Sequence, residues 1–179
     1  MKLLPFIIVL LLLFQTSSCK KVDKLTQFTK EIESEVTLPS ALGINLPFNI
    51  PTPPITTNIE EDLEVENSRK DLIEYAQLTY LKLTITEPSD KTFKWLNDAE
   101  IFIKADGLEE VRVAFIHDIS SSVGDVIELS PIEKTNVSEY IKKDEFTLRL
   151  KVITDEISLE STDIKIESKI FIDAKILGV

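Results

Sequence analysis

Apolar and polar residues alternate along most of the chain after residue 27, which places successive side chains on opposite faces of an extended strand. The alternation is clearest in residues 146–152 and 163–176, where aliphatic or aromatic residues alternate mostly with charged or hydroxyl-bearing ones. The segments that this pattern predicts to be strands are 28–38, 55–65, 81–85, 99–103, 111–115, 127–129, 146–152 and 163–176. The last of these is the longest, and we expect it to be well paired.

Most of these strands have one apolar and one charged face, which is typical of antiparallel sheets with one side in water. Two such sheets must pack together to bury both apolar sides. The pattern therefore predicts an all-β fold: a single antiparallel β-sandwich of about eight strands, immunoglobulin-like in architecture.

Two or three short helices are expected between the strands. Ser68 and Asp71 resemble a capping box, followed by the small apolar face of Leu72, Ile73 and Ala76. Residues 92–97 are expected to form one turn, and residues 135–142 another, with Val137, Tyr140 and Ile141 facing inward. None of them is long enough for a fold with crossover helices and parallel strands.

Residues 38–54 contain five of the eight prolines and no charged residue. Proline at this density excludes a central strand and favours an extended backbone. One interpretation is a strap over the end or edge of the sandwich that fills the core with Leu42, Ile44, Leu46, Phe48 and Ile50. The other is an exposed loop that binds a partner or lies on a membrane.

The pattern of residues at the N-terminus is typical of a targeting signal. Lys2 precedes twelve residues, 3–14, that are apolar throughout, a stretch about 18 Å long as a helix and so too short to span a bilayer. A positive start, an apolar middle and small residues before a boundary describe a secretory signal peptide. We expect residues 1–18 to be removed, residues 19–24 to form a short tether, and residues 25–179 to form the sandwich domain.

The only cysteine lies at that boundary, in Thr16-Ser17-Ser18-Cys19. With Leu46–Pro53 and Ala76–Pro88, this segment resembles uncharacterised envelope lipoproteins of Bacteroidetes-like bacteria. The resemblance implies that Cys19 is lipidated and becomes the mature N-terminus. Thr16 departs from the larger aliphatic residue usual three positions before the cysteine, and cleavage near Ser18 without lipidation is the alternative.

The residues after Cys19 bear on the location of the protein. By the same resemblance, Lys20 in place of an aspartate implies the outer membrane. The stretch Lys20–Lys24 has no acidic run of the kind that directs some lipoproteins to the cell surface. We therefore expect a lipid anchor in the outer membrane, with the periplasmic face favoured over the surface.

Composition excludes several classes of function. The chain has 20 Lys and Arg against 31 Asp and Glu, a net charge of −11, which provides no electrostatic basis for binding nucleic acid. One Cys and one His cannot form a structural zinc site or a disulfide framework. At 179 residues and 43% hydrophobic content, the chain fits one folded domain.

Segments with residue types suited to catalysis or metal binding have simpler interpretations. His117, Asp118 and the serines 120–122 are near neighbours on one loop, whereas a catalytic triad converges from separate segments. Residues 106–110 place three carboxylates around Gly107, which suits either calcium or, as we expect, a plain hairpin turn. The acidic residues of segment 60–66 are expected to form the wet face of a strand. No cofactor and no metal are expected.

The aromatic residues Trp95, Phe93 and Tyr80 form the one cluster that suggests a sugar platform, although a lone tryptophan in a sandwich is more often core. Trp95, Phe93 and Phe48 are the candidate contacts for a ligand or partner. The sequence thus predicts a lipid-anchored envelope protein that binds or scaffolds another envelope protein and is not an enzyme. The alternatives are a module that binds a glycan or small ligand near Trp95, and an unrecognised hydrolase that uses exposed carboxylates.

Overall fold

The structure is a computed structural model that describes residues 27–40 and 42–175. The expectations for the signal peptide, for Cys19 and for the tether therefore lie outside the described residues. The strands are β1 (Gln27–Leu38), β2 (Pro47–Pro51), β3 (Ile55–Thr56), β4 (Ile73–Glu87), β5 (Leu96–Lys104), β6 (Val111–Ile116), β7 (Val126–Glu128), β8 (Ser130–Pro131), β9 (Glu145–Thr154) and β10 (Thr162–Ala174). The helical segments are α3 (Ile59–Val65), η2 (Lys70–Leu72), η3 (Phe93–Trp95) and α4 (Ser138–Ile141).

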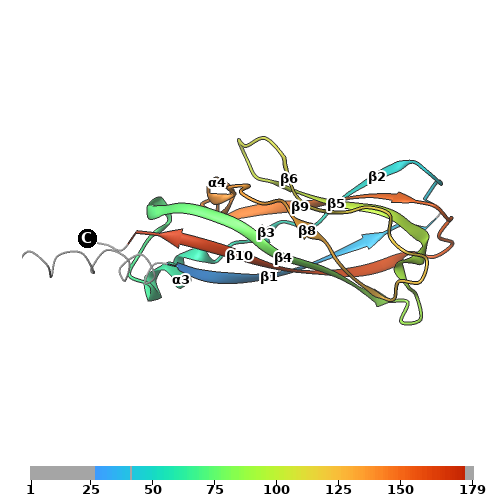
Figure 1. Ribbon diagram of the computed structural model, residues 1–179. Helices are drawn as coiled ribbons and strands as arrows, with labels where there is room; N and C mark the ends of the chain where they lie inside the picture. Colours follow the sequence, from blue (N-terminus) through green and yellow to red (C-terminus); the bar gives the residue numbers. More distant parts are fainter. Residues whose placement is uncertain (1–26, 41, 176–179) are drawn as a thin grey trace, which may run out of the picture.

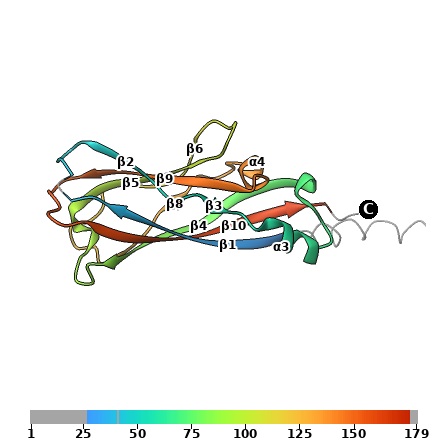
Figure 2. The same cartoon turned by 180° about the vertical axis from the view of Figure 1, so that it is seen from behind.

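The strands form two antiparallel sheets that pack face to face (Figures 1 and 2). The first sheet has the order β1-β10-β4-β7, and the second has the order β2-β9-β5-β6-β8 with β3 also paired to β9. This arrangement confirms the all-β antiparallel sandwich. When the two-residue strands β3 and β8 are set aside, eight main strands remain, and their order in the two sheets is that of a jelly roll.

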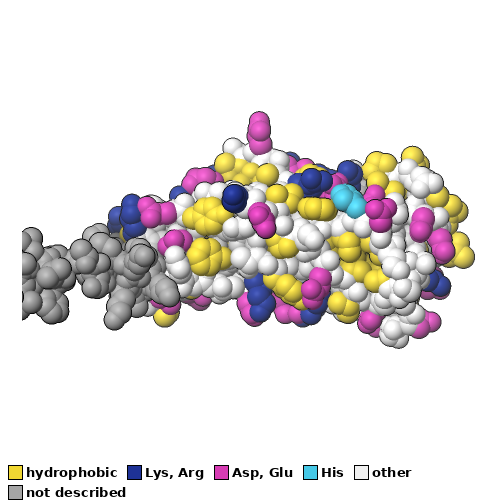
Figure 3. Space-filling model, in the orientation of Figure 1, with side chains coloured by type: hydrophobic (Ala, Val, Ile, Leu, Met, Phe, Trp, Pro, Cys, Tyr) yellow, Lys and Arg dark blue, Asp and Glu magenta, His cyan; other side chains and the backbone are white. Residues whose placement is uncertain are grey.

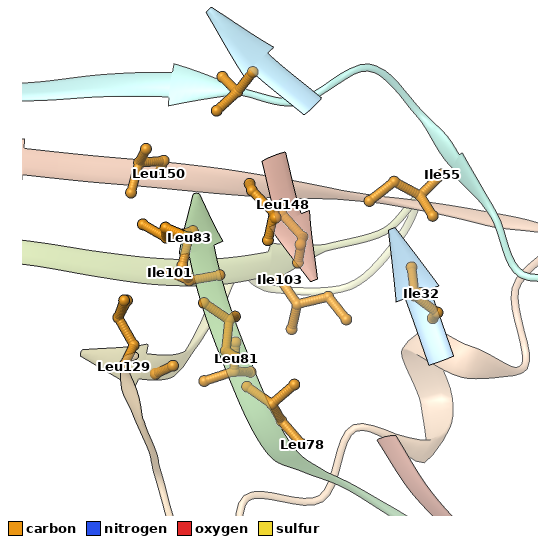
Figure 4. Packing of buried hydrophobic residues seen from close by; sticks show 14 of the residues in the cluster. Ile32, Ile55, Leu78, Leu81, Leu83, Ile101, Ile103, Leu129, Leu148 and Leu150 are labelled. Carbon is orange, nitrogen blue, oxygen red and sulfur yellow. The ribbon is translucent and has the colours of Figure 1, made fainter. Parts of the chain in front are cut away.

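The longest predicted strand, β10, is well paired, as expected: it lies between β1 and β4 and pairs with both. The apolar side chains of the two sheets fill the space between them (Figure 4). Leu81 and Leu83 of β4 face Ile101 of β5 and Leu150 of β9, and all four are fully buried. The alternation in the sequence therefore places one face of each main strand in a common core.

The segment 55–65 is not one strand, contrary to the prediction. Its strand β3 contains only two residues, and α3 follows it. Ile59 and Leu63 are four residues apart, so they share one face of the helix, and both are fully buried. The carboxylates of residues 60–62 lie in the first turn, where the helix dipole favours negative charge, so they form the wet face of a helix rather than of a strand.

The helix expected after Ser68 is also absent. Only the single turn η2 forms there, and Ile73 and Ala76 lie in β4 instead. The Ser68 hydroxyl donates a hydrogen bond to the Lys175 carbonyl (2.6 Å) rather than capping a helix. The other two short helices are confirmed: η3 lies within residues 92–97, and α4 lies within 135–142. Val137 at its N-cap and Ile141 at its end are buried, and Tyr140 packs partly against the core, as expected.

The proline-rich segment 38–54 combines both interpretations. Leu42 is buried, and Phe48 and Ile50 pack partly against the core. Ile44 and Leu46 are exposed, so the expectation that they fill the core is wrong. The segment contributes β2, an edge strand that begins and ends with proline, and an edge is the place in a sheet where proline is tolerated.

The two described ends of the chain lie at one end of the sandwich, because Gln27 at the start of β1 pairs with Asp173 near the end of β10 (Figure 1). The opposite end, which we call the distal end, carries the loops 39–46, 88–95 and 155–161. Backbone hydrogen bonds from Asn45 to Thr154 and from Asp155 to Trp95 hold these loops together. A strand of the length of β10 separates the two ends by about 40 Å.

Candidate functional site

A hollow of about 420 Å³ opens at the distal end between two loops. One wall is formed by residues 90–92 with Lys94 and Trp95, and the other by residues 156–160. The first wall is fixed by Phe93, whose side chain is fully buried and whose backbone N–H donates to the Gly124 carbonyl (2.9 Å). The sequence candidate Phe93 is therefore a core residue that positions the site rather than a contact.

Trp95, the main sequence candidate, borders this hollow but is only 4% exposed. The Lys91 ammonium lies 5.1 Å from the centre of the indole ring. The indole N–H is buried and has no hydrogen-bond partner within the described part of the chain. Trp95 is thus a wall of the hollow with an unused donor, not an exposed stacking platform.

Lys91 connects the two walls. Its ammonium donates to the Ser158 hydroxyl (2.6 Å) and to the Glu160 carbonyl (3.1 Å). Burial lowers the pKa of Lys91 from its ordinary value, although the charge of Glu160 acts in the opposite direction. These contacts hold the two loops together and place the positive charge of Lys91 over the Trp95 ring.

Exposed apolar side chains gather at the same end. Among the described residues, four of the six large apolar side chains that are exposed belong to the distal loops: Ile44, Leu46, Ile157 and Leu159. Leu159 is 84% exposed. Figure 3 shows apolar atoms gathered at this end of the molecule. We call these four residues the distal tip; exposed apolar groups of this kind often mark contact surfaces.

The third sequence candidate, Phe48, lies beside this tip. It is half-buried, and a Cβ atom placed on Gly43 would lie 3.7 Å from the Phe48 ring and 3.2 Å from Leu46 Cδ1. Gly43 thus leaves room for Leu46 and Phe48 to lie against the loop. Trp95 and Phe48 are accordingly brought to the same end of the sandwich, while Tyr80 lies on the outer face of the first sheet, where its hydroxyl donates to Glu128 (3.0 Å).

The outer face of the second sheet carries a charge network that sequence reasoning missed. The Glu100 side chain is 9% exposed and accepts hydrogen bonds from Arg112 and from Lys151 (2.7 Å). Arg149 makes a two-point contact with Glu110 and lies 4.0 Å from the centre of the Phe102 ring. The alternation of apolar and polar residues predicts that these side chains face outward. It does not predict which residues of neighbouring strands lie opposite each other.

The carboxylates of this network are neutralised by cations of the same network. Burial raises the pKa of Glu100, but the hydrogen bonds from Lys151 and Arg112 outweigh burial and hold it below its ordinary value of 4.5. The hydrogen bond from Arg149 likewise lowers the pKa of Glu110. Each carboxylate is paired with a cation, so the network stabilises the sheet face and offers no free acid or base.

The other segments with reactive residue types are not assembled into sites. His117 contacts Asp98 (3.3 Å), while Ser120 and Ser122 hydrogen-bond to each other (2.8 Å). Gly107 has a φ of 72°, which fits the expected hairpin turn. Across residues 27–40 and 42–175, no cluster of His, Cys, Asp and Glu is suited to hold a metal, and no helix is long and apolar enough to cross a membrane.

No protein-family model matches the chain, and no curated protein matches it. The chain is similar to several solved structures at low identity. A decameric BFDV capsid protein is 10% identical with a TM-score of 0.35, over 82% of this chain and 99% of the capsid chain. CBM32-3 from a family 31 glycoside hydrolase of Clostridium perfringens is 10% identical with a TM-score of 0.31, over 79% of this chain and 75% of that chain.

A third likeness is to BuGH86 in complex with neoagarooctaose, which is 11% identical with a TM-score of 0.35. It covers 80% of this chain but only 20% of the BuGH86 chain. At these identities and TM-scores the likenesses assign no family. The all-β sandwich rests on the strand pairing of the chain itself.

Proposed function

We propose that the protein is a lipid-anchored, non-enzymatic binding or scaffolding module of the bacterial cell envelope that meets its partner through the distal tip. The observation that carries this proposal is the placement of the tip at the end of the sandwich opposite to the pairing of Gln27 with Asp173. An anchor that precedes residue 27 joins the domain at the near end. The tip then points away from the membrane.

In this proposal Cys19 carries the lipid, after removal of residues 1–18, and residues 19–24 form the tether. Acyl chains on Cys19 hold the protein on the membrane because each buried methylene contributes about 0.8 kcal/mol. Seven residues lie between Cys19 and Gln27, and the eight steps from one to the other can span about 28 Å at most. The near end of the domain therefore stays close to the bilayer. The face of the outer membrane in this proposal is the periplasmic one, which the residues after Cys19 favour.

The chemistry of the tip favours another envelope protein as the partner. Ile157 and Leu159 project from a loop that also carries Asp155, Glu156 and Glu160. Apolar side chains within a polar rim are typical of protein contact surfaces. The acidic rim also disfavours an anionic lipid surface as the occupant of the tip.

A glycan or small ligand in the hollow beside Trp95 is the second candidate. The unused indole N–H and the cation of Lys91 favour a ligand rich in hydroxyl or carbonyl oxygens. A ligand in the hollow would lie beside the indole ring, so its binding should change the emission of the only tryptophan. Fluorescence titration with a panel of glycans tests this candidate; a flat response across the panel contradicts it. Turnover of a substrate panel would instead support the hydrolase alternative.

Site-specific photo-crosslinking in living cells tests the tip as the contact surface. A photo-reactive residue at Leu159 is compared with one at Val65, which is 78% exposed in α3. Both positions are exposed and apolar, so they differ mainly in the end of the domain that they occupy. We expect one discrete protein adduct from position 159 and none of that size from position 65. Equal adducts from both positions would contradict the proposal.

Substitution of the tip provides the matched functional test. Leu159→Ser should leave the free energy of unfolding within about 0.5 kcal/mol of the wild type because the side chain is exposed. The crosslink from a neighbouring tip position should nevertheless be lost. Val65→Ser is the control and should retain it. A Leu159→Ser variant that keeps the full adduct yield would show that the contact lies elsewhere.

A further inference from the structure

The sandwich has four sheet edges, and three of them are protected. In the second sheet, β2 begins and ends with proline, and β8 contains only Ser130 and Pro131. In the first sheet, β7 contains only three residues. Short strands and prolines are common devices that prevent a sheet from pairing with another chain.

The fourth edge, β1, lacks these devices along most of its length. It has twelve residues, contains no proline, and pairs with β10 in one unbroken register. Within the described residues, no backbone hydrogen bond joins residues 27–38 to anything other than β10. The outward backbone groups of β1 therefore have no hydrogen-bond partner among residues 27–40 and 42–175.

One feature that hinders the addition of another strand is present near the start of β1. Lys30 is partly buried on the face of β1 that carries Ile32, and its ammonium pairs with Asp62 of α3 (2.5 Å). An inward-pointing charge of this kind blocks the addition of a strand. The open part of the edge is therefore residues 31–37, which we call the β1 edge.

The charges along the first sheet indicate what fits this edge. Glu31, Glu33 and Glu35 project from β1 on the solvent side and are exposed. On the β10 side two of them contact lysines: Lys169, directly opposite, lies 2.7 Å from Glu31. Lys165, a diagonal neighbour, lies 2.9 Å from Glu33 and so offsets the charge of Glu167, which is directly opposite Glu33. Cross-strand pairs of opposite charge stabilise a sheet, whereas like charges opposite each other destabilise it. On its other side, no strand of the described part of the chain lies beside this acidic row.

We propose that the β1 edge accepts an extended segment of a partner protein in which Lys or Arg alternates with apolar residues. The segment adds to the first sheet as a further strand, so main-chain hydrogen bonds supply affinity and the acidic row selects basic side chains. Its apolar residues continue the inner face beside Ile32 and Val36, which are buried. A second copy of this chain does not fit, because pairing β1 with β1 would bring the acidic rows together.

This surface is separate from the anchor and from the distal tip, so the proposal stands or falls independently of the proposed function. The test uses the full-length protein, expressed with its own N-terminal segment and purified in detergent. The probe is a fluorescent peptide about eight residues long in which Lys alternates with Val, which is long enough to cover the edge. A peptide in which Glu replaces each Lys is the matched control. Binding is measured by fluorescence anisotropy.

We expect the Lys peptide to bind and the Glu peptide not to bind. Reversal of the acidic row in Glu33→Lys/Glu35→Lys should weaken the Lys peptide about tenfold and allow the Glu peptide to bind. The milder Glu33→Gln/Glu35→Gln variant should weaken the Lys peptide less and serves if the reversal disturbs folding. Glu128→Lys, which reverses a carboxylate on the strand at the opposite edge of the same sheet, is the control and should bind the Lys peptide within about twofold of the wild type.

Hydrogen exchange locates the bound peptide. Backbone amides of residues 31–37 should gain protection when the Lys peptide is added, and those of β7 should not. Equal weakening by Glu128→Lys, or protection that appears outside β1, would overturn the proposal, because the peptide would then bind through general charge attraction. A stable dimer that protects residues 31–37 without peptide would also overturn it and would identify a second copy as the occupant.

Discussion

Gln27 and Asp173 lie directly opposite each other in the pairing of β1 with β10, and the Gln27 side-chain amide donates a hydrogen bond to Asp173 Oδ2 (3.2 Å). This contact joins residues 146 positions apart in the chain. It fixes the start of the first strand and the end of the last strand at the same end of the sandwich. The distal tip is consequently the part of the domain farthest from an N-terminal anchor.

Gly107→Ala should destabilise the fold by about 1 kcal/mol. The φ of Gly107 is 72°, in the left-handed region, and this turn connects β5 to β6. No atom lies within 4 Å of the position that a Cβ would take at Gly107 or at Gly124. A steric clash therefore cannot account for a difference in stability between the two alanine variants. Gly124 has no positive φ, and Gly124→Ala should be neutral or stabilise by up to about 1 kcal/mol. Urea unfolding of both variants measures the difference; equal losses would contradict this account of the turn.

Glu100→Gln should lower the free energy of unfolding at neutral pH by about 1–2 kcal/mol, because two charge-assisted hydrogen bonds lose their ionised acceptor. The pKa of Glu100 also sets the direction in which its contribution to stability changes with pH. The pKa of Glu100 in the folded protein is below 4.5, so its contribution is present above that value and is lost as the pH falls through the folded pKa. The wild type should therefore lose stability on acidification more steeply than Glu100→Gln does.

Urea midpoints of both proteins, measured from neutral pH downwards, check this prediction. Glu139→Gln is a suitable control because Glu139 is exposed and its ion pair is a local one, with Lys142 at the C-cap of the same short helix. Its pH profile should follow that of the wild type. Parallel profiles for the wild type and Glu100→Gln would mean that the buried carboxylate contributes nothing to the pH dependence.

The sandwich was predictable because strand alternation is a local signal. In β9 and β10, every second residue is buried, and all of these buried residues except Thr154, Thr162 and Ser168 are apolar. Ile59 and Leu63 show where this signal fails. Two apolar residues four apart satisfy both an alternating strand and one face of a helix, and only the packing of α3 against the core decides between them.

The candidate site was predictable only in part. Trp95 was identified from its residue type, but its burial and the contact with Lys91 depend on two loops separated by about 60 residues. The part of the distal tip in loop 155–161 was missed because nothing in a single sequence shows that Ile157 and Leu159 are exposed rather than buried. The pairing of Glu100 with Arg112 and Lys151 depends on strand register, which a single sequence does not supply.

Proteolytic shaving of intact cells tests the proposed orientation. A protease added outside should leave the protein intact, along with a known periplasmic control, until the outer membrane is broken. The exposed distal loops provide cleavage sites once the protease has access. Loss of the protein from intact cells while the control survives would place the domain on the cell surface.

The lipid anchor at Cys19 is the central claim, and fractionation of cells that express the wild type or Cys19→Ala tests it most directly. The wild type should sediment with the outer membrane, and Cys19→Ala should appear in the soluble fraction with its sandwich folded, because the substitution lies outside residues 27–175. Equal thermal unfolding of the two purified proteins checks the fold. A Cys19→Ala protein that remains in the membrane pellet would contradict the account.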